Sequence, residues 1–335
     1  MTAPALGPGG EFERIRSFLR GAPPLPGSVR VGPGDDAAVL SDGTVLSTDL
    51  AIEGVHFRLD WITAEEAGYR SAASAVSDLA AMAAEPIGVL VSVAAPGDGE
   101  LAEEVMAGVK RLAGDVGAAL LGGDLTRSPG PLLLDVVSVG RTDRALLRSG
   151  AAAGDELWVT GALGAAAAAV ALWDSGRTVP APLRDAFVRP RPRLREARWL
   201  VEAGATSGID VSDGIAGDAA HIAAASGVAV VLERDALPVH ATLHDVALPE
   251  GRDALALALH GGDDYEILVG APAGRLGPRA EEFARKFDLS LTRVGRVESG
   301  KGVFLETARP AARVPLTRGG FDHFAPAVPS ARGGR

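Results

Sequence analysis

Aspartate side chains that stand beside glycines or at the ends of apolar runs recur along this chain. Between Gly32 and Phe57, the pair Asp35 and Asp36 precedes a short apolar run, and Asp49 follows it. Further aspartates of this kind are Asp78, Asp124, Asp210, Asp213, Asp263 and Asp264. A single Asp-Gly pair usually forms a turn and nothing more. Several carboxylates that converge in a fold repel one another unless cations neutralise them, so the whole set points to bound metal.

The residue types present restrict which metal such a site could hold. The chain has no cysteine and only six histidines. Disulfides, thiolate zinc sites and a catalytic thiol are therefore excluded. Oxygen ligands favour Mg²⁺ or a similar hard cation, which completes its octahedron with water and substrate phosphates. An acidic protein that binds ATP through several Mg²⁺ ions fits this pattern, whereas a net charge of −10 argues against a nucleic-acid partner.

The length and hydropathy of the chain indicate a folded protein of two domains. Its 335 residues suit two domains better than one, and 47% hydrophobic residues are ample for packed cores. The first residues lack the pattern of a secretory signal, and the longest apolar stretches, such as Gly164 to Trp173, are too short to span a bilayer. We therefore expect a cytoplasmic protein without a membrane partner.

The pattern of the first half predicts an α+β domain. A short helix over residues 11–20 and a Pro/Gly-rich connector precede it. Two β-like runs on either side of a turn at residues 41–43 predict a hairpin, and Thr63 with Glu66 matches a capping box that opens a long helix. Later runs complete a β-β-α-β-α-β-β order, which predicts a sheet with helices on one face.

The second half predicts a separate α/β domain beyond a boundary near residue 145. Strand and helix patterns alternate again, with an alanine-rich helix from Gly161 and a strand from Asp264. The expected divisions are an N-terminal extension (1–30), an N-terminal domain (31–145), a C-terminal domain (146–325) and a disordered tail (326–335).

Two strings that imitate nucleotide-binding motifs fail on their context. Residues 32–37 fit G-x-G-x-x-A, but a dinucleotide fingerprint follows a strand and opens a helix, whereas this string precedes a β-like run and carries two carboxylates. Residues 295–301 fit G-x-x-x-x-G-K, but Gly302 replaces the Ser or Thr that would hold Mg²⁺, and a strand follows. We interpret the second string as a hairpin turn.

Three sites leave a structural and a functional interpretation open. The segment 210–214 follows an apolar strand and opens a helix, so Ser212 or Asp213 is either an N-cap or part of a helix terminus that meets phosphate and metal. His56 is either a structural histidine or a substrate contact. Arg148 either clamps a nucleotide phosphate or lies in a solvated domain linker.

Six motifs in a fixed order carry a family resemblance. They are GDDAAVL, STDLAIEGVHF, SAVSDLAAMAAEP, LLGGDLTR, DVSDGIAGD and GGDDYEIL. With this order and spacing, over residues 32–324, the chain resembles the thiamine-monophosphate kinases, whose superfamily includes aminoimidazole ribonucleotide synthetase. The resemblance implies transfer of the ATP γ-phosphate to thiamine monophosphate, giving thiamine diphosphate. It also implies an N-terminal α+β domain whose mixed sheet pairs in a homodimer, and a C-terminal α/β domain of the synthetase type.

The resemblance further implies roles for particular side chains. The metal ligands would be Asp35, Ser47, Thr48, Asp49, Asp78, Asp124, Asp210 and Asp213. The nucleotide contacts would be Gly123, Asp124, Arg148 and Ser212, and the acceptor contacts would be His56, Asp263 and Phe321. The expected mechanism is direct in-line transfer assisted by several Mg²⁺ ions and supported by Asp78 and Asp210, without a covalent phospho-enzyme. The role of Asp36 stays open, and the alternative to a functional role is that it shapes the turn.

Two positions depart from the family pattern, and two alternative functions stay open. Asp263 replaces a usual glutamate, and Phe321 replaces a frequent tryptophan. The alternatives are another ATP-using enzyme of the superfamily, of the aminoimidazole ribonucleotide synthetase type, and a non-catalytic protein that binds divalent metal. The absence of cysteine disfavours the selenophosphate-forming and hydrogenase-maturation members.

Overall fold

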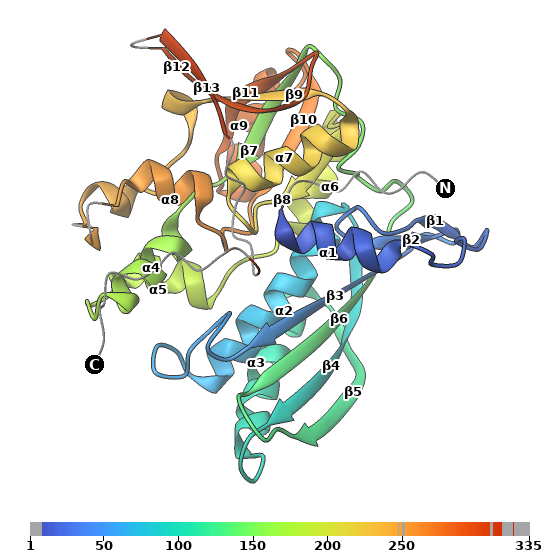
Figure 1. Cartoon of the computed structure of the whole chain (residues 1–335), viewed down its shortest axis with the longest axis vertical. Helices are drawn as coiled ribbons and strands as arrows, with labels where there is room; N and C mark the ends of the chain where they lie inside the picture. The colour runs from blue at the N-terminus through green and yellow to red at the C-terminus, as the bar shows by residue number, and fades with distance from the viewer. Residues whose placement is uncertain (1–8, 247, 250–251, 309–310, 317–323, 325–335) are drawn as a thin grey trace.

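Each half of the chain folds around its own β-sheet (Figure 1). The structure, a computed structural model, describes residues 9–246, 248–249, 252–308, 311–316 and 324. The first half contains α1 (Gly10–Leu19), β1 (Val29–Val31), β2 (Ala38–Leu40), β3 (Thr44–Ile52), α2 (Ala64–Ala81), β4 (Glu85–Ala95), α3 (Glu100–Val116), β5 (Ala119–Arg127) and β6 (Leu133–Arg141). The second half contains β7 (Asp155–Thr160), α4 (Ala165–Asp174), α5 (Ala181–Val188), α6 (Leu194–Ala203), β8 (Ser207–Asp210), α7 (Ile215–Ser226), β9 (Ala229–Glu233), α8 (Ala254–His260), β10 (Ile267–Pro272), α9 (Ala280–Phe287), β11 (Leu291–Glu298), β12 (Gly302–Ala308) and β13 (Ala311–Pro315).

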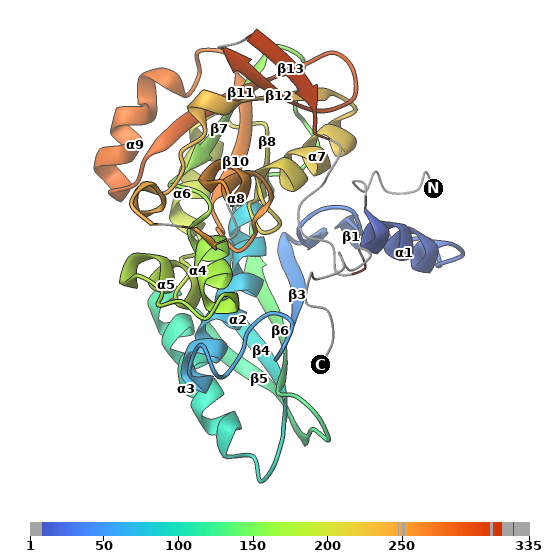
Figure 2. The ribbon, with the colours of Figure 1, turned by 60° about the vertical axis from the view of Figure 1, so that its left-hand side comes forward.

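The N-terminal sheet carries its two long helices on one face, as predicted. Its six strands lie in the order β1-β2-β3-β6-β4-β5, and only β4 and β5 pair in parallel. The helices α2 and α3 pack side by side behind the sheet, and no helix among the described residues covers the lower part of its other face (Figure 2). The predicted α+β fold with a mixed sheet is confirmed, and the turn at residues 41–43 does join the antiparallel strands β2 and β3.

The C-terminal sheet is also mixed, with seven strands in the order β13-β12-β9-β11-β7-β10-β8. Strand β9 lies between β11 and β12 and pairs with both, in parallel with β12. Residues 299–301 therefore pass over the end of β9, and the predicted hairpin between these strands is wrong. Strand β9 is inserted between β11 and β12 by pairing with residues far away in the sequence, which no local turn signal reveals. No helix among the described residues is long and apolar enough to cross a membrane.

One predicted helix and one predicted strand begin later than expected, because residues at positive φ precede them. Helix α4 begins at Ala165 instead of Gly161, because Gly161 and Gly164 have φ values of +62° and +88°. Strand β10 begins three residues after Asp264, because Asp263 and Tyr265 have φ values of +68° and +50°, which interrupt an extended strand. The predicted disordered tail and Phe321 lie outside the described residues.

Helix α2 connects the two domains. Its capping box is present as predicted: the Thr63 hydroxyl accepts from the Glu66 amide at 3.2 Å, and the Glu66 carboxylate accepts from the Thr63 amide at 3.0 Å. The same Glu66 carboxylate accepts two hydrogen bonds from Arg184 of α5, at 2.7 and 2.8 Å. Because α2 also contacts α6 and β8, it is buried on nearly all sides.

The crossing of α2 and α3 depends on two glycines. A Cβ atom added at Gly108 would lie 1.8 Å from the Glu65 carbonyl oxygen, and one added at Gly68 would lie 2.0 Å from the Val105 carbonyl oxygen. Both contacts are with backbone, which cannot rotate away. The absence of side chains at these two positions therefore sets the distance between the helices.

We expect Gly108→Ala to lower the free energy of unfolding by about 2–3 kcal/mol, because the added methyl group forces the helices apart. Gly114→Ala is the matched control on the same helix, since nothing lies within 4 Å of its added Cβ. There alanine should raise stability by about 0.5–1 kcal/mol through helix propensity. Urea denaturation of both variants measures the difference, and equal stabilities would contradict the close-packing argument.

Candidate active site

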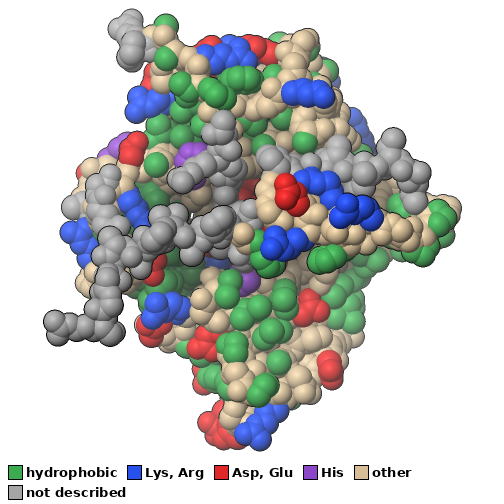
Figure 3. Space-filling view, viewed as in Figure 1, with side chains coloured by type: hydrophobic (Ala, Val, Ile, Leu, Met, Phe, Trp, Pro, Cys, Tyr) green, Lys and Arg blue, Asp and Glu red, His purple; other side chains and the backbone are tan. Residues whose placement is uncertain are grey.

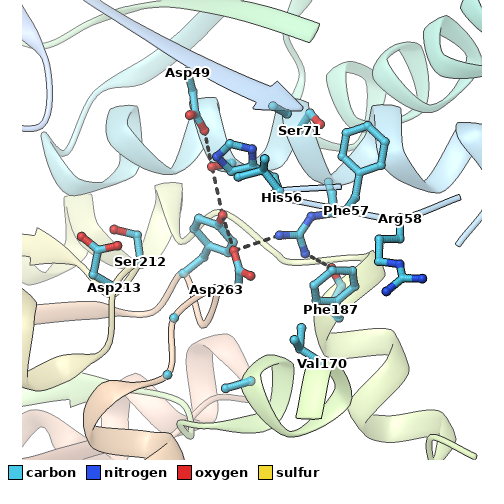
Figure 4. Close-up of a pocket in the computed structure, with 18 of the residues that line it drawn as sticks. Asp49, His56, Phe57, Arg58, Ser71, Val170, Phe187, Ser212, Asp213 and Asp263 are labelled. Carbon is cyan, nitrogen blue, oxygen red and sulfur yellow. Dashed lines mark hydrogen bonds and ion pairs between the residues drawn. The ribbon is translucent and has the colours of Figure 1, made fainter. Parts of the chain in front are cut away.

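A cleft of about 790 Å³ lies between the two domains. Helix α2 and the unpaired edge of β3 with the following loop form one wall. Residues from α4, α5 and α8 and from the segments 210–213 and 261–265 form the other. Figure 4 shows side chains from both walls pointing toward each other, among them Asp49 and His56 opposite Ser212, Asp213 and Asp263.

Three carboxylates converge beside this cleft and form the acid cluster, which we define as Asp36, Asp78 and Asp210. One oxygen of each lies within 4.8 Å of the others. The Ser47 hydroxyl donates a short hydrogen bond to Asp78, and the Ser77 hydroxyl donates to Asp210 at 2.6 Å. The segment before β2, helix α2 and the end of β8 each contribute one carboxylate, so the cluster exists only in the folded chain.

The acid cluster contains Asp36, whose role the sequence left open, and the predicted metal ligand Asp35 lies next to it in the chain. The Asp35 carboxylate accepts from the Arg148 amide at 3.1 and 3.3 Å, which ties the two domains together, and its contact with a metal stays a prediction. The Arg148 guanidinium donates to Asp36 Oδ1 at 2.6 and 3.2 Å. Arg148 is thus largely buried in an ion pair, and the alternative of a solvated linker residue is wrong. Its predicted nucleotide contact stays a prediction.

Burial and mutual repulsion raise the pKa values of these carboxyl groups. Removal from water, followed by the charge of Asp36, raises the pKa of Asp210 to about 7. Burial and the charges of Asp210 and Asp36 raise the pKa of Asp78 well above its usual value. Burial and Asp36 likewise raise the pKa of Asp35 to about 6. These shifts show how poorly the site tolerates its own negative charge without a cation.

The acid cluster fits a bound hard cation. Arg148 offers one positive charge to three carboxylates, and Asp36 Oδ2 is buried without a hydrogen-bond partner among the described residues. Its donors are oxygens only, which suits Mg²⁺ better than softer metals. Asp78 and Asp210 also line the cleft, where the phosphates of a ligand could complete the coordination.

Two predicted metal ligands, Thr48 and Asp124, lie on the sheet face opposite the acid cluster. Thr48 lies at the edge of β3, and its hydroxyl donates to Asp135 at 2.7 Å, on the sheet face opposite Ser47. The strand register places Asp124 of β5 on the same face as Asp135, because both pair with Ser92. Gly123 and Asp124 lie outside the cleft lining, whereas Thr48 is part of it. The alternation of side chains along a strand separates these positions from the cluster.

The segment between β8 and α7 does not form the N-cap that the structural interpretation of residues 210–214 predicts. Gly214 is the N-cap of α7, and neither Ser212 nor Asp213 caps the helix. The N-cap alternative for these two residues is therefore wrong. Ser212 and Asp213 line the cleft beside Asp210 instead.

His56 and Asp263 line the same cleft, and their contact with an acceptor stays a prediction. The Ile52 amide donates to His56 Nδ1 at 3.0 Å, which orients the ring. Asp263 Oδ1 accepts from Arg70 at 2.9 Å and from the Tyr265 hydroxyl at 2.9 Å. Burial and the charge of Asp263 raise the pKa of Tyr265 well above its usual value, so this hydroxyl stays protonated at neutral pH.

Sequence reasoning identified Asp78 of α2 but missed the other polar side chains of this helix that organise the site. Arg70, Ser74, Ser77 and Asp78 follow one another at intervals of four, three and one residue. This spacing places them on one side of a helix. The signal is therefore visible in the sequence as a polar stripe on an otherwise alanine-rich helix.

Both domains of the chain match known proteins. The model of the AIR synthase related protein N-terminal domain matches residues 34–142, and that of the C-terminal domain matches residues 152–307. Thiamine-monophosphate kinase of Mycobacterium tuberculosis strain H37Rv is 40% identical over 281 residues, which cover 80% of this chain and 82% of that protein. The chain belongs to the thiamine-monophosphate kinase family. It is therefore an enzyme of the kinase class, as the ordered motifs predict.

Solved structures of thiamine-monophosphate kinases share this architecture. The crystal structure of the enzyme from Stenotrophomonas maltophilia K279a is 36% identical, with a TM-score of 0.73, and the match covers 90% of this chain and 96% of that chain. A structure described as AaThiL complexed with AMPPCP and TMP is 29% identical, with a TM-score of 0.80, and covers 95% of this chain and 97% of that chain. The similarity therefore extends over both domains and the cleft between them.

We expect the metal-free protein to lose thermal stability as the pH rises from about 5.5 to 8. The pKa of Asp210 is raised from its ordinary value of 3.8 to about 7, so the folded state holds a proton that the unfolded state releases. This contribution is fully present below pH 3.8 and is lost as the pH rises through 7. Melting temperatures in EDTA should therefore fall with pH, and Mg²⁺ should restore them most at pH 8.

Asp210→Asn is the control for this titration, because asparagine stays neutral at every pH. The variant should have a flatter stability profile and respond less to Mg²⁺. Equal effects of Mg²⁺ at pH 5.5 and pH 8 in the unaltered protein would contradict the predicted linkage.

Proposed function

We propose that the chain transfers the γ-phosphate of ATP to the phosphate of thiamine monophosphate, giving thiamine diphosphate. The observation that carries the proposal is one cleft with the acid cluster at one end and a largely apolar cavity at the other. Family membership supports the same pair of substrates. So does the solved relative complexed with AMPPCP, an ATP analogue, and TMP.

In this proposal the acid cluster holds Mg²⁺ at the nucleotide end, with Ser47 and Asp49 beside it. Bound Mg²⁺ would neutralise phosphate charge on both substrates. The chain itself contributes positioning, because the Ser77 hydroxyl and Arg148 fix two of the three carboxylates before substrate binds. A phosphate oxygen of the acceptor is already ionised at neutral pH, so in-line attack needs no general base. The predicted ligands Asp35 and Asp213 add further negative charge that Mg²⁺ would neutralise.

The other end of the cleft suits an acceptor with an aromatic ring. Trp61, Val170 and Phe187 line it with apolar surface against which a ring can pack. Arg58 and Arg70 lie over the Trp61 and Phe187 rings. His56 and Asp263 add polar groups that can orient a ring substituent. This combination matches the thiazolium and aminopyrimidine rings of thiamine monophosphate.

Release of ADP in a coupled assay tests the proposed function. We expect Mg²⁺-dependent turnover with thiamine monophosphate and none with the substrate of aminoimidazole ribonucleotide synthetase. Asp78→Asn should lower kcat by at least about 100-fold. Loss of an outer-shell partner of a metal costs up to about 100-fold, and loss of a direct ligand should cost no less. Asp235→Asn, at an exposed carboxylate outside the cleft, is the control and should retain normal turnover. Turnover on the synthetase substrate alone would refute the proposal.

We also propose that two copies of the chain pair through the uncovered face of the N-terminal sheet. Leu50 of β3 and Leu90 of β4 are 45% and 37% exposed on this face. Every residue of the edge strand β5 is exposed, including Leu120, Leu121 and Leu125. Figure 3 shows apolar side chains spread over the lower part of the molecule, where this sheet lies in Figure 1. Such a patch on an open sheet favours an interface.

Light scattering coupled to gel filtration tests the pairing. We expect a dimer that dissociates when Leu50→Glu and Leu90→Glu are combined, because two carboxylates would then be buried at the interface. Val314→Glu on β13 is the control, since Val314 is 48% exposed but belongs to the C-terminal sheet. A monomeric unaltered protein would contradict the proposal. The interface would include Thr48 and Asp124, whose predicted roles would then be tested in the dimer.

A further inference from the structure

A continuous line of hydrogen bonds runs from the acceptor end of the cleft to the metal end (Figure 4). The Tyr265 hydroxyl lies 2.9 Å from Asp263 Oδ1 and 3.0 Å from the Ser74 hydroxyl. Ser74 donates a short hydrogen bond to the carboxylate of Asp49. The line thus joins a predicted acceptor contact of the C-terminal domain to a predicted metal ligand of the N-terminal domain.

The two hydroxyl groups in this line have two protons for three hydrogen-bond contacts. Each hydroxyl has one proton to donate. If Tyr265 donates to Ser74 and Ser74 to Asp49, Asp263 keeps only its bond from Arg70. If Ser74 donates to Tyr265 and Tyr265 to Asp263, Asp49 loses its bond from Ser74. The same atoms therefore support two arrangements that differ only by rotation of two O–H bonds.

The surroundings of Tyr265 fix its backbone and its ring, so only the hydroxyl groups of the line can rotate. The Tyr265 amide donates to the Val211 carbonyl at 2.8 Å, and the Asp263 amide donates to the Ser212 carbonyl at 2.8 Å. These bonds hold both residues at positive φ, a conformation that residues other than glycine rarely adopt. Tyr265 itself is buried, so its ring cannot swing out.

Arg70 fixes the acceptor end of the line. It is buried, its guanidinium lies 3.8 Å from the centre of the Phe187 ring, and it donates to the Phe187 carbonyl at 2.8 Å. Arg70 and Tyr265 both reach Oδ1 of Asp263. The other oxygen, Oδ2, accepts no hydrogen bond from the residues that the structure describes, and it is available to an acceptor.

We propose that Tyr265 and Ser74 couple metal binding to acceptor binding, which makes Tyr265 a positioning residue for both ends of the cleft. The inference rests on the proposed function. A cation bound to Asp49 competes with the Ser74 hydroxyl for the lone pairs of that carboxylate. It therefore favours the arrangement in which Ser74 donates to Tyr265 and Tyr265 donates to Asp263. Two donors then hold Asp263 Oδ1, and Oδ2 meets the acceptor in a fixed orientation. Metal therefore tightens acceptor binding, and the acceptor tightens metal binding by the same factor.

Calorimetric titration with thiamine, with and without Mg²⁺, tests the coupling. Thiamine has the rings of the proposed acceptor but no phosphate, so direct contact between its phosphate and the metal does not contribute. We expect Mg²⁺ to lower the Kd of thiamine about fivefold or more in the unaltered protein, within the usual range for coupled sites. In Tyr265→Phe the ring still packs but both hydroxyl contacts are lost, and the Kd should change less than about twofold with Mg²⁺.

Tyr69→Phe is the matched control, at the only other tyrosine of the chain. The Tyr69 hydroxyl donates to Asp115 at 3.3 Å, outside the cleft, so this variant should keep the full Mg²⁺ effect. Ser74→Ala breaks the same line from the other side and should lose the effect, which provides a second test if Tyr265→Phe folds poorly. Thermal melting checks the fold of each variant.

Two outcomes overturn the coupling. One is an equal Mg²⁺ effect in Tyr265→Phe, Ser74→Ala and the unaltered protein, and the other is no Mg²⁺ effect in the unaltered protein while it phosphorylates thiamine monophosphate. Failure of the unaltered protein to phosphorylate thiamine monophosphate overturns the proposed function instead. A Mg²⁺ effect that is lost in both variants and kept in Tyr69→Phe supports the coupling.

Discussion

Mutual repulsion among buried carboxylates is the constraint on which the rest of this structure depends. Asp36, Asp78 and Asp210 come from three distant parts of the sequence, yet their oxygens lie within 4.8 Å of one another. Burial of like charges is costly without a counter-charge, and the raised pKa values of Asp78 and Asp210 express that cost. Arg148 compensates only part of the charge. The fold must therefore hold these groups in place against a force that separates them, and bound cations would reverse that force.

Helix α2 provides the rigidity that this arrangement needs. One side carries the polar stripe that includes Arg70 and Asp78 and faces the cleft. Another side presents Gly68 to the backbone of α3, so the two helices lie too close together for side chains at the crossing. The capping box and the ion pair of Glu66 with Arg184 fix its first turn against the C-terminal domain. One helix thus positions groups at both ends of the cleft.

The acceptor end depends on a segment with an unusual backbone. Asp263 and Tyr265 both adopt positive φ, and backbone bonds to Val211 and Ser212 keep them there. The segment preceding the helix α7 and the segment preceding β10 therefore support each other. A movement in one displaces the other, and this gives a physical route by which the two ends of the cleft can respond together.

The sequence by itself determined the residue chemistry and most of the elements. Glycine-flanked aspartates without cysteine indicated oxygen ligands for a hard cation, Thr63 and Glu66 indicated the start of α2, and the ordered motifs indicated the family. These signals are local or depend on residue type alone. The capping box, for example, involves residues only three positions apart.

Only the tertiary structure decided which of these residues act together. It selected Asp36 over its neighbour Asp35 for the acid cluster, because adjacent residues point in different directions and long-range packing decides which direction is the site. It placed Thr48 and Asp124 across the sheet from that cluster through strand register, and it inserted β9 between β11 and β12. Each of these outcomes depends on contacts between segments far apart in the chain, which local propensity does not specify.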